Sequence, residues 1–540
     1  MRILVADKLA EEGLGLLKGS GIGFDVKVGL KEDELASAVG AYDALIVRSG
    51  AKVTAKVLAN PGKLKAIARA GVGVDNIDLP ASTAKGILVM NTAEASTLST
   101  AEHAMALMMA LARKIPAADA HVKSGQWKRA AFEGTQLAGK TLGVVGLGRI
   151  GKTVAIRALA MEMNVLGFDP YISAPSVLDG RVRIIKDFDE FLSQLDVITF
   201  HVPGGAGTKH LLNRERLLGK CRPNLLVIND ARGEVVDEFA LADALKEKKI
   251  AGAAVDVYAK EPPPADHPLF KVDNAVLTPH LGASTEEAQT AVSVQACEAI
   301  VAYLQRGEIR GAVNAGGIRL DLPPDEAPFA SLATRMGVLL GAMLDTGFKT
   351  VTLRVHGPRT VKLSNTLMRL ATVELLRPHL DTDIVNVINV EHHAKARGID
   401  LVQIKEESPP SGLVGEVIEL RADMENGGEH HRVVGTVYAD GLPRVVRVDN
   451  YSMDVIPEGS MVLITNRDQP GTIGTVGTTF GDAGVNIADM VISRTAASGS
   501  AKTAMMILKI DTSASDALLA KLRAHPNILR VRPVEMPALG

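Results

Sequence analysis

Three polar side chains lie just beyond short aliphatic runs in the middle of the chain. Arg232 follows the run 225–229, Glu261 follows 255–258, and His280 comes directly after Leu-Thr-Pro. In an open α/β sheet, ligands bind in the crevice at the carboxyl ends of the strands. A histidine with an ordinary pKa of about 6.5 suits a base that takes a hydroxyl proton. A carboxylate suits its partner and an arginine suits a substrate carboxylate. Each residue alone could be an ordinary surface or loop residue, but together they indicate oxidation of a hydroxy acid.

A glycine-rich sequence predicts the cofactor for such a reaction. Gly146, Gly148 and Gly151 form the pattern G-x-G-x-x-G between the aliphatic run 142–145 and a predicted helix. Glycines in this context let the backbone turn tightly and approach a pyrophosphate, which the helix N-terminus stabilises. Asp169, at the end of the next predicted strand, would bond the adenosine ribose hydroxyls and repel a 2′-phosphate. The pattern therefore predicts NAD rather than NADP.

Alternating aliphatic and amphipathic stretches must position these residues, and they predict βαβ units with parallel sheets. The expected fold class is α/β, with two doubly wound lobes facing each other across a cleft. Long helices over 99–114 and 285–306 should cross between the lobes, and Ser99 with Glu102 forms a capping-box pattern in the first. The predicted strands are 3–6, 24–28, 44–47, 65–68 and 87–90, then 141–146, 164–169, 197–202, 225–229, 251–257 and 275–278.

The sequence changes character after residue 315. Gly316-Gly317 and the proline-rich stretch 322–325 predict a linker. Beyond it, a helix over 331–344 and strands over 350–355, 433–438 and 445–448 indicate an α+β unit. A last unit begins at residue 459 with a strand–helix–strand pattern.

Charge and cysteine content exclude several classes of protein. The 540 residues include 60 basic and 62 acidic side chains, a net charge of −2. This balance argues against a nucleic-acid or membrane-surface protein, and no signal peptide or membrane span is expected. Cys221 and Cys297 are the only cysteines, and neither has metal-type spacing around it. We therefore expect no metal, no disulfide framework and a cytoplasmic location.

Five segments together resemble the D-isomer-specific 2-hydroxyacid dehydrogenases. Over essentially its whole length, the chain resembles the long-form branch of this family, which oxidises 3-phosphoglycerate. The segments are 69–76, 146–151, 229–233, 256–262 and 279–284. The resemblance implies that His280 is the acid/base, Glu261 its partner and Arg232 the carboxylate anchor. It implies NAD contacts from Val72, Gly146, Gly148, Arg149, Ile150, Gly151, Asp169, Val202, Asp230, Ala231, Arg232, Asp256, His280, Leu281, Gly282 and Ala283.

The resemblance also implies a domain order. A flavodoxin-like substrate-binding domain at 1–97 and 283–316 would enclose a Rossmann-type NAD-binding domain at 98–282. An intervening, anion-binding-like domain would follow at 317–456, and a C-terminal ACT regulatory domain at 457–540.

The first lobe is expected to hold the substrate. Gly71, Val72 and Gly73 would offer backbone N–H groups to its carboxylate. The resemblance implies that Arg48, followed by Ser49, meets the phosphate. Arg129 lies in a basic turn that either reaches a neighbouring subunit's site or is simply solvated, and a homotetramer is the expected assembly.

The tail has two interpretations. The resemblance implies that Asn466, Asp468 and Asn486 hold serine at a dimer interface, with Asp468 on the ammonium and Asn486 on the carboxylate. The alternative is that the tail only assembles subunits. Other members carry a larger side chain at position 466.

The sequence also departs from the family next to the catalytic arginine. Asp230 and Glu234 flank Arg232 where the family more often has small or neutral residues, and either is expected to compete for its guanidinium. Asp256 is expected to contact the nicotinamide carboxamide.

The expected activity is NAD-dependent oxidation of 3-phosphoglycerate to 3-phosphooxypyruvate, the first step towards serine. The alternatives are the same chemistry on glycerate, hydroxypyruvate or 2-hydroxyglutarate, and a non-catalytic NAD-sensing protein. The long tail argues against a simpler dehydrogenase, which would end near residue 315. Because both lobes together hold every catalytic residue, removal of 459–540 is expected to leave a folded, active enzyme.

Overall fold

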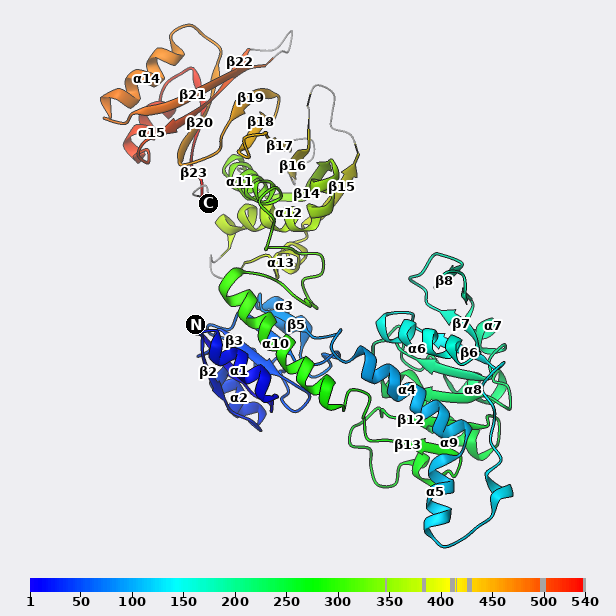
Figure 1. Cartoon of the computed structure of the whole chain (residues 1–540). Coiled ribbons are helices and arrows are strands. Elements are labelled where there is room, and N and C mark those ends of the chain that lie inside the picture. Colours follow the sequence, from blue (N-terminus) through cyan, green and yellow to red (C-terminus); the bar gives the residue numbers. More distant parts are fainter. Residues whose placement is uncertain are drawn as a thin grey trace.

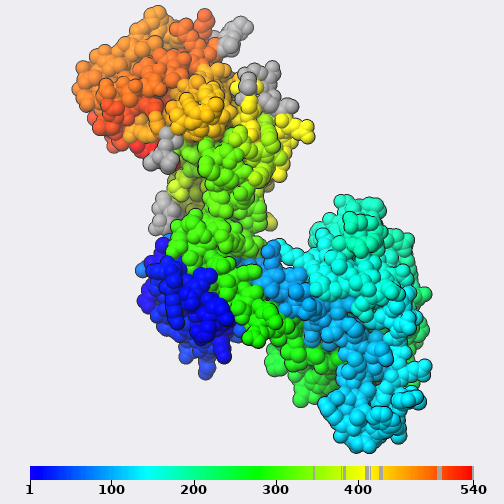
Figure 2. Space-filling view, in the orientation of Figure 1, coloured from blue at the N-terminus to red at the C-terminus, as the bar shows by residue number. Residues whose placement is uncertain are grey.

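The chain folds into two α/β lobes followed by two C-terminal units (Figure 1). This computed structural model describes residues 1–344, 347–380, 385–407, 413, 415–424, 430–495 and 502–537. The end of the expected ACT domain, 538–540, lies outside the described residues. In Figure 2 the C-terminal units stack on the first lobe, and the second lobe stands to one side. Among the described helices, none is long and apolar enough to cross a membrane.

The first lobe is a parallel sheet in the order β2-β1-β3-β4-β5. Its strands are β1 (Arg2–Val5), β2 (Gly23–Val26), β3 (Ala44–Val47), β4 (Ala66–Arg69) and β5 (Leu88–Asn91), and its helices are α1 (Glu11–Gly19), α2 (Glu32–Val39), α3 (Leu79–Ala84) and the returning α10 (Glu286–Arg306). Apart from the edge strand β2, whose residues are exposed or half-buried, these strands are almost entirely buried, as is typical of sheets covered on both faces. Val292, Ala296 and Ile300 of α10 pack on one face, and Leu35 and Val39 of α2 on the other.

The second lobe is an eight-stranded sheet in the order β13-β12-β11-β10-β6-β7-β9-β8, parallel except for the β8–β9 pair. Its strands are β6 (Thr141–Val145), β7 (Asn164–Phe168), β8 (Ser176–Val177), β9 (Val182–Ile184), β10 (Val197–Phe200), β11 (Leu226–Asn229), β12 (Gly252–Val255) and β13 (Ala275–Leu277). Its helices are α4 (Thr97–Ala112), α5 (Ile115–Lys123), α6 (Arg149–Ala160), α7 (Phe188–Leu192), α8 (Arg214–Gly219) and α9 (Glu238–Lys246), with 3₁₀ turns η1 (Arg129–Phe132), η2 (Gly233–Val235) and η3 (Pro268–Lys271). The predicted pair of doubly wound lobes is confirmed.

The two lobes are joined where α4 and α10 cross between them (Figure 1). The predicted capping box is wrong, because α4 begins at Thr97 and Ser99 lies inside it. The Ser99 hydroxyl lies instead 2.8 Å from the hydroxyl of Thr285, the N-cap of α10. Ser99 therefore ties the starts of the two crossing helices together.

The third unit is a mixed sheet in the order β15-β14-β16-β17-β18-β19. Its elements are α11 (Ala327–Met343), β14 (Phe348–His356), α12 (Pro358–Leu376), η4 (Arg377–His379), α13 (Val390–Ala396), β15 (Asp400–Glu406), β16 (Val417–Met424), β17 (His430–Val437), β18 (Pro443–Val448) and β19 (Tyr451–Val455). The unit is attached to the first lobe: Ile388 is buried in that lobe's core, and the Asn386 side chain donates to the Gly86 carbonyl at 2.9 Å.

The last unit begins with the predicted strand, helix and strand and has βαββαβ order overall, with an antiparallel sheet, β21-β22-β20-β23. Its elements are β20 (Ser460–Arg467), α14 (Thr472–Asp482), β21 (Ile487–Arg494), β22 (Thr503–Ile510), α15 (Asp516–Arg523) and β23 (Ile528–Glu535). Met461, Ile507 and Val534 belong to the same buried core as the third sheet. The tail is therefore not separable, since a cut at residue 459 would uncover that core.

A buried arginine also fastens the last unit to the third. Arg335 on α11 is 2 % exposed, and its guanidinium donates to the carbonyls of Pro457 and Pro537 at 2.7 Å each. These carbonyls flank the last sheet in sequence, so α11 holds both of its ends.

Candidate active site

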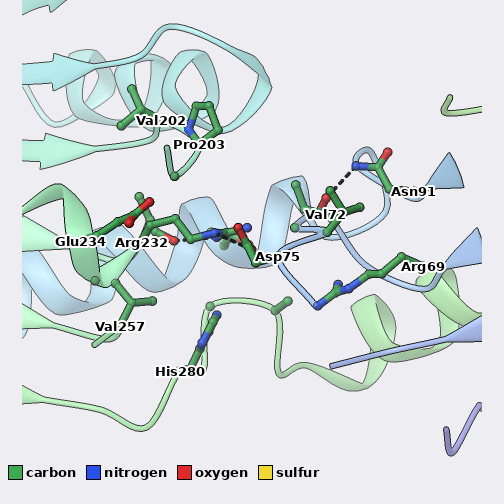
Figure 3. A pocket seen from close by; sticks show the side chains of 18 of the residues that line it. Arg69, Val72, Asp75, Asn91, Val202, Pro203, Arg232, Glu234, Val257 and His280 are labelled. Atoms are coloured by element: carbon green, nitrogen blue, oxygen red, sulfur yellow. Dashed lines mark hydrogen bonds and ion pairs between the residues drawn. The ribbon is translucent and has the colours of Figure 1, made fainter. Parts of the chain in front are cut away.

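A cavity of about 1060 Å³ lies between the two lobes. One side is formed by the segments that follow β4 and β5, and the other by the carboxyl ends of β10, β11 and β12. This is the edge at which open α/β sheets bind ligands. Figure 3 shows side chains from both lobes turned toward the space, among them Arg69 and Val72 opposite Arg232 and His280.

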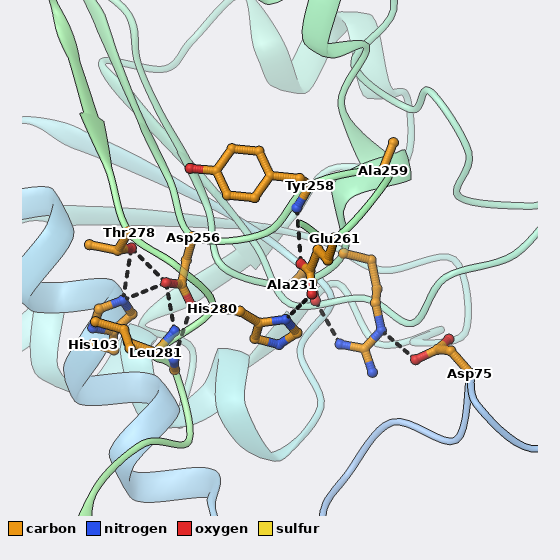
Figure 4. Close-up of polar contacts among 12 residues, drawn as sticks. Asp75, His103, Ala231, Asp256, Tyr258, Ala259, Glu261, Thr278, His280 and Leu281 are labelled. Atoms are coloured by element: carbon orange, nitrogen blue, oxygen red, sulfur yellow. Dashed lines mark hydrogen bonds and ion pairs between the residues drawn. The ribbon is translucent and has the colours of Figure 1, made fainter. Parts of the chain in front are cut away.

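His280 and Glu261 form a hydrogen-bonded pair at this cavity (Figure 4). The His280 Nδ1 lies 2.8 Å from a Glu261 oxygen, and the other Glu261 oxygen accepts from the Tyr258 N–H at 3.1 Å. The backbone N–H of His280 donates to the Asp256 carbonyl at 2.8 Å, which fixes the residue in the left-handed region at φ 58°. With Nδ1 engaged by the carboxylate, Nε2 is the nitrogen left to exchange a proton with a ligand.

Arg232 approaches the same space from the end of β11. Its Nε donates to the Asp75 carboxylate at 3.0 Å, and its Nη1 to the Ala231 carbonyl at 2.6 Å. The expectation that Asp230 or Glu234 competes for this guanidinium is wrong. The Glu234 carboxylate accepts from the Gly205 N–H at 2.6 Å, and Asp75 of the opposite lobe is the partner of Arg232.

The Asp75–Arg232 pair is easily displaced. The Asp75 side chain is 67 % exposed, and exposed ion pairs contribute at most about 1 kcal/mol. A substrate carboxylate held by further donors can therefore replace Asp75 on the arginine. Gly73 makes room for this approach, because a Cβ there would lie 1.9 Å from the Arg232 guanidinium.

The loop 71–73 offers fewer donors than expected. The Gly71 N–H is already used, because it donates to the Thr92 hydroxyl at 2.7 Å. The Val72 carbonyl accepts from the Asn91 side chain at 2.6 Å, which holds the loop in place (Figure 3). The N–H groups of Val72 and Gly73 have no acceptor within the described residues, so they can still meet a carboxylate.

Two arginines of the first lobe differ in their accessibility to a ligand. The Arg48 guanidinium donates to the Lys8 carbonyl at 3.1 Å and to Gln289 of α10. Arg69 lines the cavity, and its Nε is buried with no hydrogen-bond partner among the residues described. Burial, together with the charges of Arg232 and Arg48, lowers the pKa of Arg69 to about 10. Arg69 and Arg232 line the cavity and Arg48 does not, so the two cavity arginines give this wall a positive charge that suits an anionic ligand.

Arg69 was not among the site residues predicted from the sequence. Arg69 directly follows the predicted strand 65–68 and opens the segment 69–76. A polar residue at the carboxyl end of a strand is the same signal that located Arg232, and it could have indicated Arg69 as a ligand-binding residue. Ser49 and Arg129 are exposed, and neither lines the cavity. The roles given to Arg48, Ser49 and Arg129 stay predictions.

The glycine loop fits a dinucleotide. A Cβ at Gly146 would lie 2.6 Å from the His201 carbonyl, and one at Gly151 would lie 1.9 Å from the Gly146 carbonyl. Gly148, the N-cap of α6, has open space where its Cβ would be, which leaves the helix N-terminus approachable. Asp169 accepts from the N–H of Leu147 at 3.0 Å, and so also braces this loop.

The comparisons with known proteins agree with this geometry. The family model "D-isomer specific 2-hydroxyacid dehydrogenase, NAD binding domain" matches residues 105–282, "D-3-phosphoglycerate dehydrogenase intervening domain" matches 326–449, and "ACT domain" matches 460–527. A curated D-3-phosphoglycerate dehydrogenase of Archaeoglobus fulgidus is 39% identical over 99% of this chain and 100% of its own. One of Methanocaldococcus jannaschii is 40% identical with the same coverage. The chain belongs to the D-3-phosphoglycerate dehydrogenase family.

Solved structures resemble the two lobes. The TT0316 protein of Thermus thermophilus superposes with a TM-score of 0.54 at 36% identity, over 58% of this chain and 100% of its own. An NAD-dependent formate dehydrogenase of Staphylococcus aureus in complex with NAD gives 0.53 at 26% identity, over 58% and 99%. The NAD-binding domain of the dehydrogenase family thus coincides with the second lobe.

Asp256 lies beneath the loop that carries His280 and is not among the residues that line the cavity. It is fully buried, and its oxygens accept from the Thr278 hydroxyl and the N–H groups of Leu281 and Gly282 at 2.5–2.9 Å (Figure 4). Burial alone would raise the pKa of Asp256, but hydrogen bonds from His103, Thr278 and Leu281 hold it at about 2. Its contact with the nicotinamide carboxamide stays a prediction, whereas its role in shaping the loop that carries His280 is visible.

The three ACT residues do not form one site within a chain. Asn466 pairs across the sheet with Ala504, which faces Arg494, whereas Asn486 adjoins Ile487 at the opposite end of the sheet. Asp468 lies 3.3 Å from the Arg494 guanidinium, and the Asn486 amide donates to Asp511 at 2.8 Å. A ligand that touches both ends needs a second copy of this unit.

Proposed function

We propose that the protein oxidises 3-phosphoglycerate at C2 to 3-phosphooxypyruvate with NAD, the first step towards serine. The observation that carries the proposal is the hydrogen-bonded His280–Glu261 pair beside Arg232, at a cavity that is also lined by Arg69, whose Nε is buried with no hydrogen-bond partner among the described residues. Full-length similarity to curated D-3-phosphoglycerate dehydrogenases supports the choice of substrate.

The residues act in a simple order. Arg232 and the N–H groups of Val72 and Gly73 hold the substrate carboxylate. His280 Nε2 takes the proton of the C2 hydroxyl, and the Glu261 carboxylate stabilises the imidazolium that forms. The chemistry that NAD would supply when bound is an acceptor for the hydride of C2. The glycine loop 146–151 and Asp169 would hold its pyrophosphate and adenosine ribose.

The direct test is the appearance of NADH when the full-length protein is given 3-phosphoglycerate. Glycerate, hydroxypyruvate and 2-hydroxyglutarate, tested as substrates in the appropriate direction, serve as comparisons. A higher kcat/KM on any of these than on 3-phosphoglycerate would reject the proposed substrate while leaving the chemistry of the site in place.

Arg69 should select for the phosphate. A hydrogen bond to a charged group contributes about 1.5–3 kcal/mol, so Arg69→Ala should raise KM for 3-phosphoglycerate roughly 10- to 150-fold. The KM for glycerate, which lacks the phosphate, should rise less than about threefold on the same reasoning. Arg48→Ala should show the same selectivity with a smaller effect, because Gln289 and Lys8 already hold that guanidinium.

Steady-state kinetics on both substrates measure the selectivity of Arg69. Arg113→Ala, which removes an exposed arginine at the end of α4, is the matched control and should leave both KM values unchanged. Equal losses on the two substrates would show that Arg69 does not bind the phosphate.

The tail is proposed to bind serine between two chains, within a homotetramer in the cytoplasm. The distance between Asp468 and Asn486 in one chain supports a site shared by two copies. Exposed apolar side chains on α4, α5 and the following turn, Met109, Ile115, Val122 and Trp127, support assembly of the catalytic lobes.

Serine should lower the rate of the full-length enzyme. An allosteric effector typically changes the affinity for a second ligand about 5- to 150-fold. Serine at millimolar concentration should therefore lower the initial rate measurably. Asp468→Ala and Asn486→Ala should each abolish it, and Asp489→Asn, on an exposed carboxylate of β21, should not. The measurement is initial rate against serine concentration, and a flat curve for the unmodified enzyme would leave assembly as the role of the tail.

A further inference from the structure

Asp230 places a carboxyl group in the interior of the second lobe, where no contact within the described part of the fold accounts for its burial. It directly follows β11 and lines the cavity, two residues before Arg232. Its side chain is 0 % exposed, and neither oxygen has a hydrogen-bond partner among the residues the structure describes. A buried polar group without a partner is costly and calls for a ligand or a change of protonation. The residue lines the cavity but its carboxyl is closed off from solvent, so the charge of a bound ligand would act on it across a short distance rather than by direct contact.

The groups that face Asp230 come from three elements. The His201 Nδ1, after β10, lies 3.6 Å from an Asp230 oxygen, and burial lowers the pKa of His201 to about 3, so this imidazole is neutral. Asp256, after β12, is ionised, and His103 of α4 lies 3.2 Å from it. The Arg232 guanidinium is turned to Asp75 and Ala231. Burial and the charge of Asp256 raise the pKa of Asp230 to about 7.

The strand order places Asp230 at the reacting end of the cofactor site. Asp169 follows β7 and the glycine loop follows β6, whereas Arg232 and His280 follow β11 and β13. A dinucleotide held by Asp169 and the glycine loop, with its reacting end toward His280, would place its nicotinamide near the carboxyl ends of β10 to β12. That ring is a cation when oxidised and neutral when reduced. A buried carboxyl group beside it will therefore respond to its oxidation state.

We propose that Asp230 links the oxidation state of the bound nicotinamide to one proton. The ionised carboxylate favours the oxidised, cationic ring, and the protonated carboxyl favours the reduced, neutral ring. The hydride still passes from C2 to the ring and the hydroxyl proton still passes to His280. The proton that Asp230 gains on reduction of the ring comes from solvent. This inference rests on the proposed use of NAD but not on the identity of the hydroxy acid.

The sign of the effect follows from the charge. As pH rises from 6 to 8, Asp230 ionises, so binding of oxidised NAD should tighten and binding of NADH should weaken. If the pKa of Asp230 differs by about one unit between the two complexes, the ratio of the dissociation constants of NADH and NAD should rise about fivefold over this range. In Asp230→Asn, which keeps the shape of the side chain, the ratio should be flat.

The experiment uses the full-length protein without substrate. NADH is titrated by its fluorescence and NAD by competition, at pH 6 and at pH 8. Asp230→Ser is a second variant in case the asparagine misfolds, and it should also be flat. Glu234→Gln removes a carboxylate from the same loop whose oxygen is already paired with Gly205, and it should keep the pH dependence of the unmodified protein.

The outcomes separate the two proposals. A pH-dependent ratio that survives in Asp230→Asn assigns the proton to another group, such as His103, and overturns the inference. A ratio that is flat in the unmodified protein overturns it as well, while the proposed function stands. Failure of the unmodified protein to bind either nucleotide overturns the proposed function itself.

Discussion

Replacement of His280 by alanine should lower kcat by about 10²–10⁴-fold, because loss of a general acid or base commonly costs that much. The imidazole is held by Glu261 at 2.8 Å with its other nitrogen left for the substrate hydroxyl, and the Glu261 carboxylate is itself held by the Tyr258 N–H and cannot take its place. NADH binding, measured by fluorescence, should stay within about twofold, since the glycine loop and Asp169 lie at other strands.

Two further variants sharpen the His280 experiment. Glu261→Gln keeps a hydrogen-bonding group but removes the charge that stabilises the imidazolium, so its loss should be smaller than that of His280→Ala. His392→Ala changes an exposed histidine on α13 and should leave the rate unchanged. A His280→Ala enzyme with more than half the normal kcat would reject His280 as the acid/base.

Arg232→Ala should lower kcat/KM roughly 10- to 150-fold, which corresponds to about 1.5–3 kcal/mol for a hydrogen bond to a charged group. The loss should appear with glycerate as well as with 3-phosphoglycerate, because both carry the carboxylate that Arg232 is proposed to bind. This common loss distinguishes Arg232 from Arg69, whose effect should depend on the phosphate.

The matched variants of Arg232 change charge and geometry separately. Arg232→Lys keeps the charge but loses the planar fork, so it should recover part of the activity. Asp75→Asn removes the exposed carboxylate that holds the guanidinium in the absence of substrate and should lower KM slightly, by about twofold or less. Full activity in Arg232→Ala would assign the carboxylate to the loop 71–73 alone.

Much of the fold was predictable because its signals are local. Aliphatic runs bounded by glycines and polar residues indicate the parallel strands of both lobes, and the carboxyl ends of those strands located Arg232, Glu261 and His280. The contact between Glu261 and His280 could also be anticipated, because a histidine that acts as a base needs a carboxylate to hold its other nitrogen. The structure shows that pair at hydrogen-bond distance.

Long-range contacts were not predictable from local patterns. Ser99 has the spacing of a helix cap, but a hydroxyl 186 positions away at the start of α10 is its partner. The sequence favours a partner for Arg232 within its own loop, and Asp75 is brought to it only when the lobes face each other. Asn486 and Asp468 are close in sequence, yet α14 carries the chain to the other end of the sheet between them.

Shared hydrophobic cores join three of the four units of the molecule and leave the second lobe separate. The last two units share one core, and Ile388 roots the third unit in the first lobe. The first lobe, the third unit and the last unit thus form one continuous body. The second lobe, which is expected to bind the cofactor, is connected to this body at the crossings of α4 and α10. Any closure of the cleft would therefore move the second lobe relative to these three units. We expect a strain generated in the tail to reach the wall that carries Arg69 and Val72, so an effector should change substrate binding before it changes nucleotide binding.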